Sequence, residues 1–491
     1  MQQSSVKKSF FYQMIYQILV LILPFVTSPY IARVLGAEGV GVYSYTYSIA
    51  YYFVLFALLG IANYGNRTIA KCRDDQSKLN STFSNLVYVH IIISLASFSV
   101  YCIYAFFIST DSVYAVIQGV YILSALFDIS WFYFGIEQFK LTVTINIIIK
   151  IANVILVFML VNNSTDLWKY FLIMSIGTLV SQLALWMPLK MYVGFTRPNI
   201  REMKSHVKPL IVLFIPAIAV SLYKYMDKIM IGFLSNKAQL GYFENAEKVI
   251  NIPMSIIASF GTVMLPKMSN LATSDNKKAV ERYMSLSMQF VMCLAFALTF
   301  GLAGVGTVFA PVFWGKEFEL SGIIIMGLAS TIPFVSFCNV IRTQYLIPNC
   351  KDREYLLSVL MGSIVNLVLN ALLIRRLGAI GAMIGTIVAE VTVCFIQSFM
   401  VRKELPLLAY IKSFIFFAGT GALMFGIVYK VGSSLGIHIT TLFVQILCGA
   451  AFYLLLAVVY FIFTKNEIFL NIIMNVKKKV IIMKTSKQRL E

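Results

Sequence analysis

The sequence predicts an all-α integral membrane protein with about fourteen transmembrane helices. Of its 491 residues, 59% are hydrophobic and only 12% are charged, a composition that a water-soluble fold of this size would not tolerate on its surface. Apolar runs of about 20 residues, the length that crosses a bilayer, recur along the whole chain. No long polar interval separates these runs, so we expect no separate soluble domain.

The distribution of charge predicts how the spans are oriented. The expected helices cover residues 10–34, 40–63, 83–108, 113–135, 141–161, 167–192, 209–234, 239–265, 284–309, 319–345, 355–375, 379–400, 411–430 and 440–464. If the N-terminus is inside, the cytoplasmic segments hold about 29 of the 40 lysines and arginines, and the outer loops hold about 7. This positive-inside bias accounts for most of the formal net charge of +19 without any nucleic acid partner.

The sequence contains no pattern typical of catalysis. Its seven cysteines are dispersed without a C-x-x-C pair, and its three histidines lie far apart. It also has no P-loop and no dinucleotide-binding fingerprint. We therefore expect neither an enzyme nor a primary pump, and no metal centre or cofactor. A membrane-embedded glycosyltransferase or polymerase would be expected to have a large, charged outer loop, whereas every outer loop here is short.

The span expected at 209–234 is the most informative, because it carries charges at membrane depth. Lys224, Asp227 and Lys228 follow each other at i, i+3 and i+4, so they share one flank of the helix. A charge at this depth costs from about 2.5 to over 10 kcal/mol, and it is tolerated in a bundle interior or a water-filled cavity. Two cations for one carboxylate leave a positive surplus for an anionic ligand. The alternative is that Lys224 and Asp227 only neutralise each other between helices.

Three further spans present polar side chains at helical spacing, and we assign these side chains to the same cavity wall. They are Gln13 and Gln17 in the span 10–34, Asn146, Lys150 and Asn153 in the span 141–161, and Lys248 in the span 239–265. Lys248 follows Glu244 in the favourable i, i+4 order, so a purely structural pair is an equal alternative there.

Two carboxylates are candidates for a coupling-ion site, with Na⁺ or H⁺ as the ion. Glu390 is the only carboxylate in the span expected at 379–400. A lone buried carboxyl group either stays protonated or binds a cation, and both states suit such a site. The alternative is a hydrogen bond to a neighbouring helix. Asp128 lies near the cytoplasmic end of its span, where a structural role is the stronger alternative.

Internal similarity predicts two parallel halves. GVYSYT at Gly41 corresponds to GYFENA at Gly241, about 200 residues later. Spans of matching order would then run in the same direction, as in halves related by an axis along the membrane normal. LGAIGAMIGT at Leu377 also repeats the pattern of LGAEGVGVYS at Leu35, so part of the signal is common to membrane hairpins.

Three stretches in the first 150 residues carry a resemblance to a known family. They are SPYIARVLGAEGVGVYSYT at 28–46, GNRTIAK at 65–71 and DISWFYFGIEQFK at 128–140. With these motifs and this order of spans, the chain closely resembles the polysaccharide-transporter branch of the multidrug/oligosaccharidyl-lipid/polysaccharide exporter superfamily, the Wzx-type flippases. The resemblance implies two six-helix lobes around a central cavity, followed by two extra helices. We place the lobes at 1–208 and 209–403, and the extra helices with a basic amphipathic tail at 404–491.

The resemblance also implies a function. Such a flippase moves undecaprenyl-pyrophosphate-linked oligosaccharide, a repeat unit of capsule, O-antigen or another surface polysaccharide, to the outer leaflet by alternating access. Lys150, Lys224, Lys228 and Lys248 favour the anionic pyrophosphate, whereas an exporter of cationic drugs would need acidic walls. The alternatives are a lipid II flippase of peptidoglycan synthesis and an ion-coupled multidrug exporter of the same superfamily.

The expected location is the bacterial cell membrane, with both termini in the cytoplasm. The expected partners are membrane lipids and the lipid-linked substrate, with the polysaccharide polymerase and the glycosyltransferases of the same pathway as further candidates.

Overall fold

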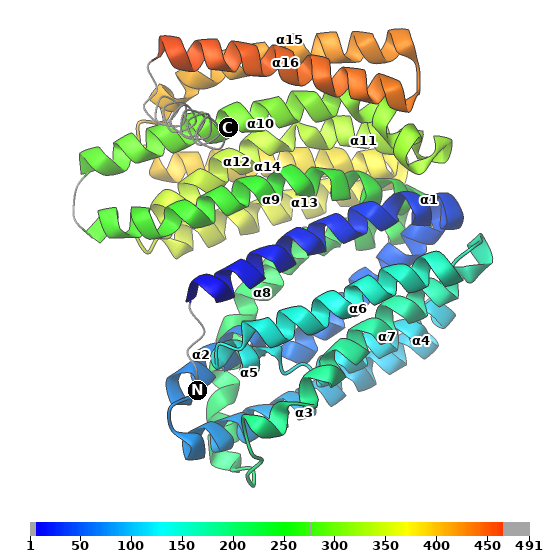
Figure 1. The fold of residues 1–491 in the computed structure, drawn as a ribbon, viewed down its shortest axis with the longest axis vertical. Coiled ribbons are helices and arrows are strands. Elements are labelled where there is room, and N and C mark those ends of the chain that lie inside the picture. Colours follow the sequence, from blue (N-terminus) through cyan, green and yellow to red (C-terminus); the bar gives the residue numbers. More distant parts are fainter. Residues whose placement is uncertain (1–5, 274–276, 465–491) are drawn as a thin grey trace, which may run out of the picture. The chain divides into compact units, whose positions relative to one another are not determined.

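The computed structural model describes residues 6–273 and 277–464, apart from the side chains of residues 6–18, 21, 223, 277 and 413. The described chain is almost entirely helical and contains no strand (Figure 1). Thirteen of its helical segments are long and apolar enough to cross a membrane. The first of them holds two predicted spans, because Gly36, at φ 69°, interrupts α1 (Val6–Leu58). If the parts of α1 before and after Gly36 are counted separately, the described chain has the fourteen predicted spans. The predicted fold class is confirmed.

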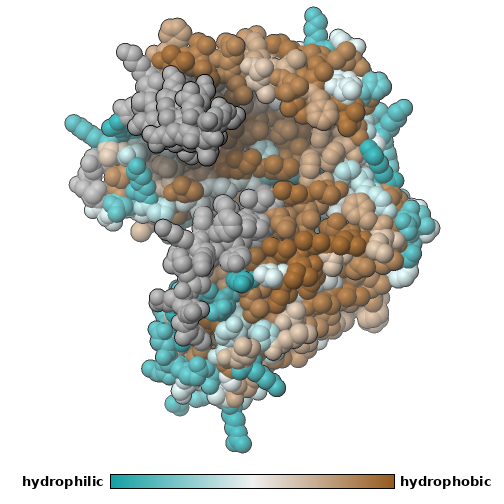
Figure 2. Space-filling view, viewed as in Figure 1, coloured by the Kyte–Doolittle hydropathy of each residue, from teal (hydrophilic) through white to brown (hydrophobic). Residues whose placement is uncertain are grey.

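Hydrophobic side chains cover most of the face shown in Figure 2, and hydrophilic ones gather along its margins. Large apolar residues are unusually exposed, among them Phe107 at 83%, Phe233 at 75% and Phe463 at 82%. A water-soluble protein would not expose so many apolar side chains, so these surfaces are suited to lipid. The protein is therefore a multi-pass membrane protein.

Contacts group the chain into two compact units. Unit 1 comprises Met1–Asn245 and Leu367–Ala382, and unit 2 comprises Ala246–Asn366 and Met383–Glu491. The lobe boundaries predicted at residues 208 and 403 do not coincide with these units. Groups defined by contacts need not follow symmetric halves, so the lobes stay a prediction.

Unit 1 holds the helices of the first half of the chain. In order they are α1, α2 (Ile61–Cys72), α3 (Gln76–Phe107), α4 (Ser112–Leu126), α5 (Ser130–Gly135), α6 (Phe139–Leu160), η1 (Ser164–Asp166), α7 (Leu167–Trp186), η2 (Leu189–Met191), α8 (Ile200–Leu234) and the first turns of α9 (Lys237–Thr273). Within it, α4 packs against α1, α3 and α7, and α6 packs against α7 (Figure 1).

Two features of unit 1 differ from the sequence-based expectation. The spans predicted at 40–63 and 83–108 leave the residues between them to a loop, but residues 64–72 belong to α2 and α3 begins at Gln76. α2 buries Ile61 and Ile69 and exposes Arg67 and Lys71, so its polar face resembled a loop. The span expected at 113–135 is likewise interrupted, ending as α4 and resuming as the short α5.

The family motifs in residues 65–71 and 128–140 pack against each other. A Cβ atom on Gly65 of α2 would lie 2.5 Å from the Trp131 ring of α5, and one on Gly135 of α5 would lie 2.6 Å from Ile69 of α2. Each helix therefore needs a glycine where the other presents a large side chain. This close contact is a physical reason for these two motifs.

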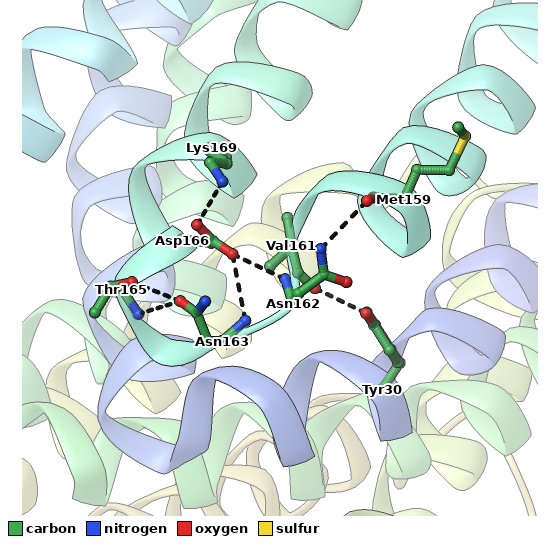
Figure 3. Close-up of polar contacts among 8 residues, drawn as sticks. All are labelled: Tyr30, Met159, Val161, Asn162, Asn163, Thr165, Asp166 and Lys169. Carbon is green, nitrogen blue, oxygen red and sulfur yellow. Dashed lines mark hydrogen bonds and ion pairs between the residues drawn. The ribbon is translucent and has the colours of Figure 1, made fainter.

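The connection between α6 and α7 is held by its own polar groups (Figure 3). The Asp166 carboxylate accepts hydrogen bonds from the backbone N–H of Asn162 at 3.0 Å and pairs with the ammonium of Lys169 at 2.6 Å. The Tyr30 hydroxyl of α1 donates to the carbonyl oxygen of Val161 at 2.8 Å. This loop therefore fixes the end of α6 to α1.

Unit 2 holds the remaining helices. After the rest of α9 they are α10 (Lys277–Trp314), η3 (Lys316–Phe318), α11 (Glu319–Ala329), α12 (Thr331–Ile341), the π-helical turn η4 (Arg342–Leu346), α13 (Asp352–Leu377), α14 (Ala379–Val401), α15 (Leu407–Leu435) and α16 (Ile439–Phe463), with the stretch 367–382 assigned to unit 1. α10 packs against α11, α12, α15 and α16. The basic tail predicted after residue 464 lies outside the described residues.

Candidate functional site

Two segments that the internal repeat relates cross within unit 1. A Cβ atom on Gly41 would lie 1.7 Å from the carbonyl oxygen of Lys237, and one on Gly241 would lie 2.0 Å from the carbonyl oxygen of Ala37. The two contacts are equivalent under a shift of 200 residues, because residues 37 and 41 correspond to residues 237 and 241. The backbones can approach this closely only because neither glycine has a side chain. The similarity between residues 41–46 and 241–246 thus has a physical counterpart.

A buried ion pair lies beside this crossing. The Lys228 ammonium of α8 lies 2.8 Å from Oε2 of Glu244 on α9, and the side chains are 10% and 16% exposed. The hydroxyl of Ser44 on α1 donates to the same carboxylate oxygen at 2.7 Å. Three helices therefore contribute to one charged cluster, as expected for charges held inside a membrane protein. We call Ser44, Lys228 and Glu244 the α8–α9 charge cluster.

Asp227 makes a separate contact. Its carboxylate accepts a hydrogen bond from the side-chain amide of Asn370 on α13 at 2.6 Å, and both residues are buried. Asn370 belongs to the stretch of α13 that is part of unit 1. Lys228 pairs with Glu244, which comes from the next helix at the glycine crossing.

Lys224 differs from Lys228 in exposure. Lys224 is exposed and Lys228 is 8% exposed, although they are one turn apart on α8. Their ammonium nitrogens lie 5.7 and 5.5 Å from the centre of the same Tyr225 ring. Both distances fall within cation–π range. α8 therefore carries one accessible and one buried cation beside a single aromatic ring.

Tyrosines surround this part of α8. Tyr225 stacks on Tyr51 with ring centres 4.2 Å apart, and Tyr47 stacks on Tyr121 at 5.2 Å. The hydroxyls of Tyr47 and Tyr121 lie 3.4 Å apart. The tyrosines of α1 thus pack against α4 and α8.

The predicted polar residues of α6 have a different environment. Asn146 accepts a hydrogen bond from the Ser181 hydroxyl of α7 at 2.5 Å and donates to the carbonyl oxygen of Thr142 at 2.9 Å. Asn153 occupies the space above Gly177 of α7. Both asparagines therefore contact α7. Lys150 lies between them and is partly buried, and no hydrogen bond or ion pair reaches its ammonium from the described residues.

The structure places the other predicted residues as follows. Gln13 and Gln17 lie on the α1 backbone, but their side chains are outside the described part of the chain, and Lys248 is partly buried on α9 within unit 2. Asp128 accepts hydrogen bonds from the Ser130 backbone N–H at 2.9 Å and from the Ser130 hydroxyl at 2.6 Å, so it shapes the turn between α4 and α5.

Glu390 lies partly buried on α14. Its role and the role of Asp128 as coupling-ion residues stay predictions. Within residues 6–273 and 277–464, no group of three or more histidines, cysteines or carboxylates is arranged to hold a metal ion.

Sequence reasoning missed two contributors to the site. Glu244 was considered only as the i, i+4 partner of Lys248, and Ser44 was not considered. Asn370 stands four residues after Asn366, and this spacing indicates a polar helix face, but it does not identify Asp227 as the partner.

Known proteins resemble this chain in sequence. A putative O-antigen transporter of Shigella dysenteriae is 23% identical over 381 residues, which cover 76% of this chain and 94% of that protein. A probable low-salt glycan biosynthesis flippase of Haloferax volcanii, Agl15, is 24% identical over 248 residues, which cover 50% of this chain and 51% of that protein.

The fold also matches a solved structure. The lipid II flippase MurJ in an inward closed conformation has a TM-score of 0.75 and 16% identity, and the match covers 91% of this chain and 99% of that chain. At this identity the likeness concerns the fold alone. A family model described as polysaccharide biosynthesis protein matches residues 6–272, which is more than half of the chain. The resemblance predicted from the three N-terminal motifs is therefore confirmed, and the chain belongs to the polysaccharide biosynthesis protein family.

Proposed function

We propose that this protein is a flippase that moves lipid-linked oligosaccharide units from the inner to the outer leaflet. Membership of the polysaccharide biosynthesis family supports this function, as do relatives that are named as an O-antigen transporter and a glycan biosynthesis flippase. The observation that carries the proposal is the pair of lysines on α8. Lys224 and Lys228 lie on one tyrosine ring in a transmembrane helix, where only an anionic ligand or a counter-ion justifies their charge.

The proposed ligand is an undecaprenyl-pyrophosphate-linked oligosaccharide. Lysine ammonium groups would bind its pyrophosphate by charge-assisted hydrogen bonds. Lysine suits a ligand that moves, because its compact charge on a flexible stem does not require one fixed bidentate geometry. In this proposal the two predicted lobes expose the cations alternately to each side of the membrane. The polymerase and glycosyltransferases of the same pathway are the proposed protein partners.

The proposed location is the bacterial cell membrane with both termini in the cytoplasm. The charge bias of the loops supports this orientation. Glu38 and Ser77 are both exposed, whereas Ala37 is fully buried, so Glu38 is the better position for an outer label. A membrane-impermeant thiol reagent applied to intact cells should modify Glu38→Cys but not Ser77→Cys. The opposite pattern would invert the topology.

Transport is proposed to be coupled to a gradient of Na⁺ or H⁺ through Glu390, with Asp128 as the second candidate. Glu390→Gln keeps the volume and most of the hydrogen-bonding capacity but removes the charge. The variant should transport more slowly and should lose its response to collapse of one of the two gradients. A normal rate with a normal response would assign Glu390 a structural role.

The direct test is a flipping assay in proteoliposomes that contain the purified full-length protein. Defined lipid-linked oligosaccharides and lipid II are supplied separately, and the fraction that reaches the opposite leaflet is measured. We expect flipping of at least one surface-polysaccharide precursor and weaker flipping of lipid II. Preferential flipping of lipid II would instead support the peptidoglycan alternative, and flipping of neither lipid would contradict the proposal.

A further inference from the structure

We propose that Glu244 is the resident counter-ion of Lys228 and that the pyrophosphate of the substrate replaces it in each transport cycle. The inference rests on the proposed function and assigns separate roles to the two lysines of α8. Its basis is the α8–α9 charge cluster, in which the Lys228 ammonium lies 2.8 Å from Glu244 Oε2 and the Ser44 hydroxyl donates to the same oxygen at 2.7 Å.

The environment of the pair explains why an exchange is possible. Removing one partner of a buried ion pair is costly, because it leaves an uncompensated charge in a medium of low dielectric constant. Replacing the carboxylate with a phosphate avoids this cost, since the ammonium always keeps one anion. When Lys228 turns to the phosphate, Glu244 keeps the hydroxyl of Ser44 as a donor. Neither charged group is then left without a hydrogen bond.

Asp227 is less suited to this exchange, although it is adjacent to Lys228 in sequence. Its carboxylate accepts the side-chain amide of Asn370 at 2.6 Å, which links α8 to α13. Residues i and i+1 on a helix also point in different directions, about 100° apart. The two carboxylates near Lys228 therefore have different roles: Asp227 anchors the helix, and Glu244 compensates the cation.

Lys224 acts before Lys228 in this scheme. Lys224 is exposed and Lys228 is buried, and both ammonium groups lie within cation–π range of the Tyr225 ring. The two positions are one helical turn apart, about 6 Å along the axis, a spacing that the oxygens of two linked phosphates can bridge. The anion first meets Lys224 and then competes with Glu244 for Lys228. The same competition returns Lys228 to Glu244 and releases the product.

The test uses the full-length protein in nanodiscs and farnesyl diphosphate as the probe, with farnesol as the uncharged reference. Glu244→Gln removes the competing charge but keeps the shape of the side chain. It should bind farnesyl diphosphate about three- to tenfold more tightly than the natural sequence, the range expected for one freed charge-assisted contact. The flipping rate should fall, because release becomes slower. Glu38→Gln, an exposed carboxyl on α1, is the matched control and should leave the dissociation constant unchanged.

A second variant keeps the proposal testable if Glu244→Gln does not fold. Lys228→Gln/Glu244→Gln contains neither charge, so no buried ion is left unpaired. It should bind farnesyl diphosphate more weakly than the natural sequence, and thermal unfolding in detergent checks that it is folded. Unchanged affinity in this double variant, or unchanged or weaker affinity in folded Glu244→Gln, would overturn the exchange.

The same measurements separate this inference from the proposed function. If the natural protein prefers farnesyl diphosphate to farnesol and Lys224→Ala removes this preference, the cationic binding site is supported, whatever the result for the Glu244 variants. If neither the natural protein nor any variant prefers the diphosphate, both the exchange and the pyrophosphate site are wrong.

Discussion

α6 and α8 look alike in sequence, yet their polar residues have different environments. Each is an apolar helix with a lysine among polar residues at three- and four-residue spacing. On α6, Asn146 and Asn153 contact the neighbouring helix α7. On α8, Lys228 pairs with a carboxylate from α9, and Asp227 bonds an amide from α13.

The difference teaches how to interpret polar spacing in a membrane helix. Amides and hydroxyls are satisfied by one neighbour, and they commonly serve as contacts between helices. Charges need an opposite charge or a ligand, so they bring several helices together. The polar pattern predicts that a face is buried in protein, whereas the identity of the residues predicts whether charge is available there.

The largest effect should follow the loss of Lys228. Lys228→Ala leaves Glu244 buried without its ammonium, and breaking such a pair typically costs about 3–5 kcal/mol. We expect a clear drop in the unfolding temperature in detergent together with loss of flipping. Lys228→Gln/Glu244→Gln should recover most of the stability but not the flipping. An unchanged unfolding temperature in Lys228→Ala would show that the pair contributes little.

The exposed lysine should separate function from stability. Lys224→Ala removes a side chain that is not buried, so the free energy of unfolding should change by less than about 0.5 kcal/mol. The flipping rate should nevertheless fall about tenfold or more, because a charge-assisted contact to the substrate is lost. Lys224→Arg should rescue flipping better than Lys224→Gln. Equal rescue by both would mean that the charge of Lys224 is not what matters.

Lys150 provides the corresponding test on α6. Its ammonium has no partner among the described residues, so Lys150→Ala removes an uncompensated charge rather than a pair. Stability should be unchanged or slightly higher, as measured by thermal unfolding. If Lys150 belongs to the substrate path, flipping should fall as in Lys224→Ala. Normal flipping would remove α6 from the proposed cavity wall.

A smaller effect is expected for the asparagine of α6. A double-mutant cycle with Asn146→Ala and Ser181→Ala should give a coupling energy of about 0.6 kcal/mol, and at most about 2 kcal/mol, the range for hydrogen bonds between membrane helices. Flipping by the folded variants should stay near normal. Strong loss of flipping without loss of stability would show that Asn146 contributes to the substrate path.

The spans and the polar face of α8 could be predicted because both depend on local sequence. Bilayer thickness sets the length of an apolar run, and helical spacing places Lys224 and Lys228 together. The partner of Lys228 could not be predicted in this way. Glu244 reaches it only because Gly41 and Gly241 let two helices cross, and that is a tertiary contact.

Local spacing also left one residue with two compatible explanations. Glu244 stands four residues before Lys248, the spacing of a helical ion pair, and this local pair was an equal alternative to a role in the cavity wall. Asn370 lies 143 residues from Asp227, and no local pattern relates them. The polar face of α2 was mistaken for a loop because charge was given more weight than the periodic burial of Ile61 and Ile69.

The smallest effect should come from an exposed ion pair outside the spans, which contrasts with the buried pair of α8. Glu404 accepts hydrogen bonds from the Lys351 ammonium and from the Tyr345 hydroxyl, each at 2.6 Å. The Lys351 hydrogen bond is the main cause that lowers the pKa of the Glu404 carboxyl below its ordinary value. A lowered folded-state pKa means that the pair stabilises the protein above the unfolded pKa of about 4.3 and that this contribution is lost as the pH falls further.

Exposure limits the size of this effect. The Glu404 side chain is 39% exposed, so solvent screening should keep the contribution below about 1 kcal/mol. Between pH 7 and pH 3, Glu404→Gln should lose slightly less thermal stability than the natural sequence, and high salt should reduce the difference. Glu38→Gln again serves as the exposed control and should follow the natural sequence. A Glu404→Gln variant with an acid loss as large as that of the natural protein would show that this exposed pair adds nothing measurable to stability.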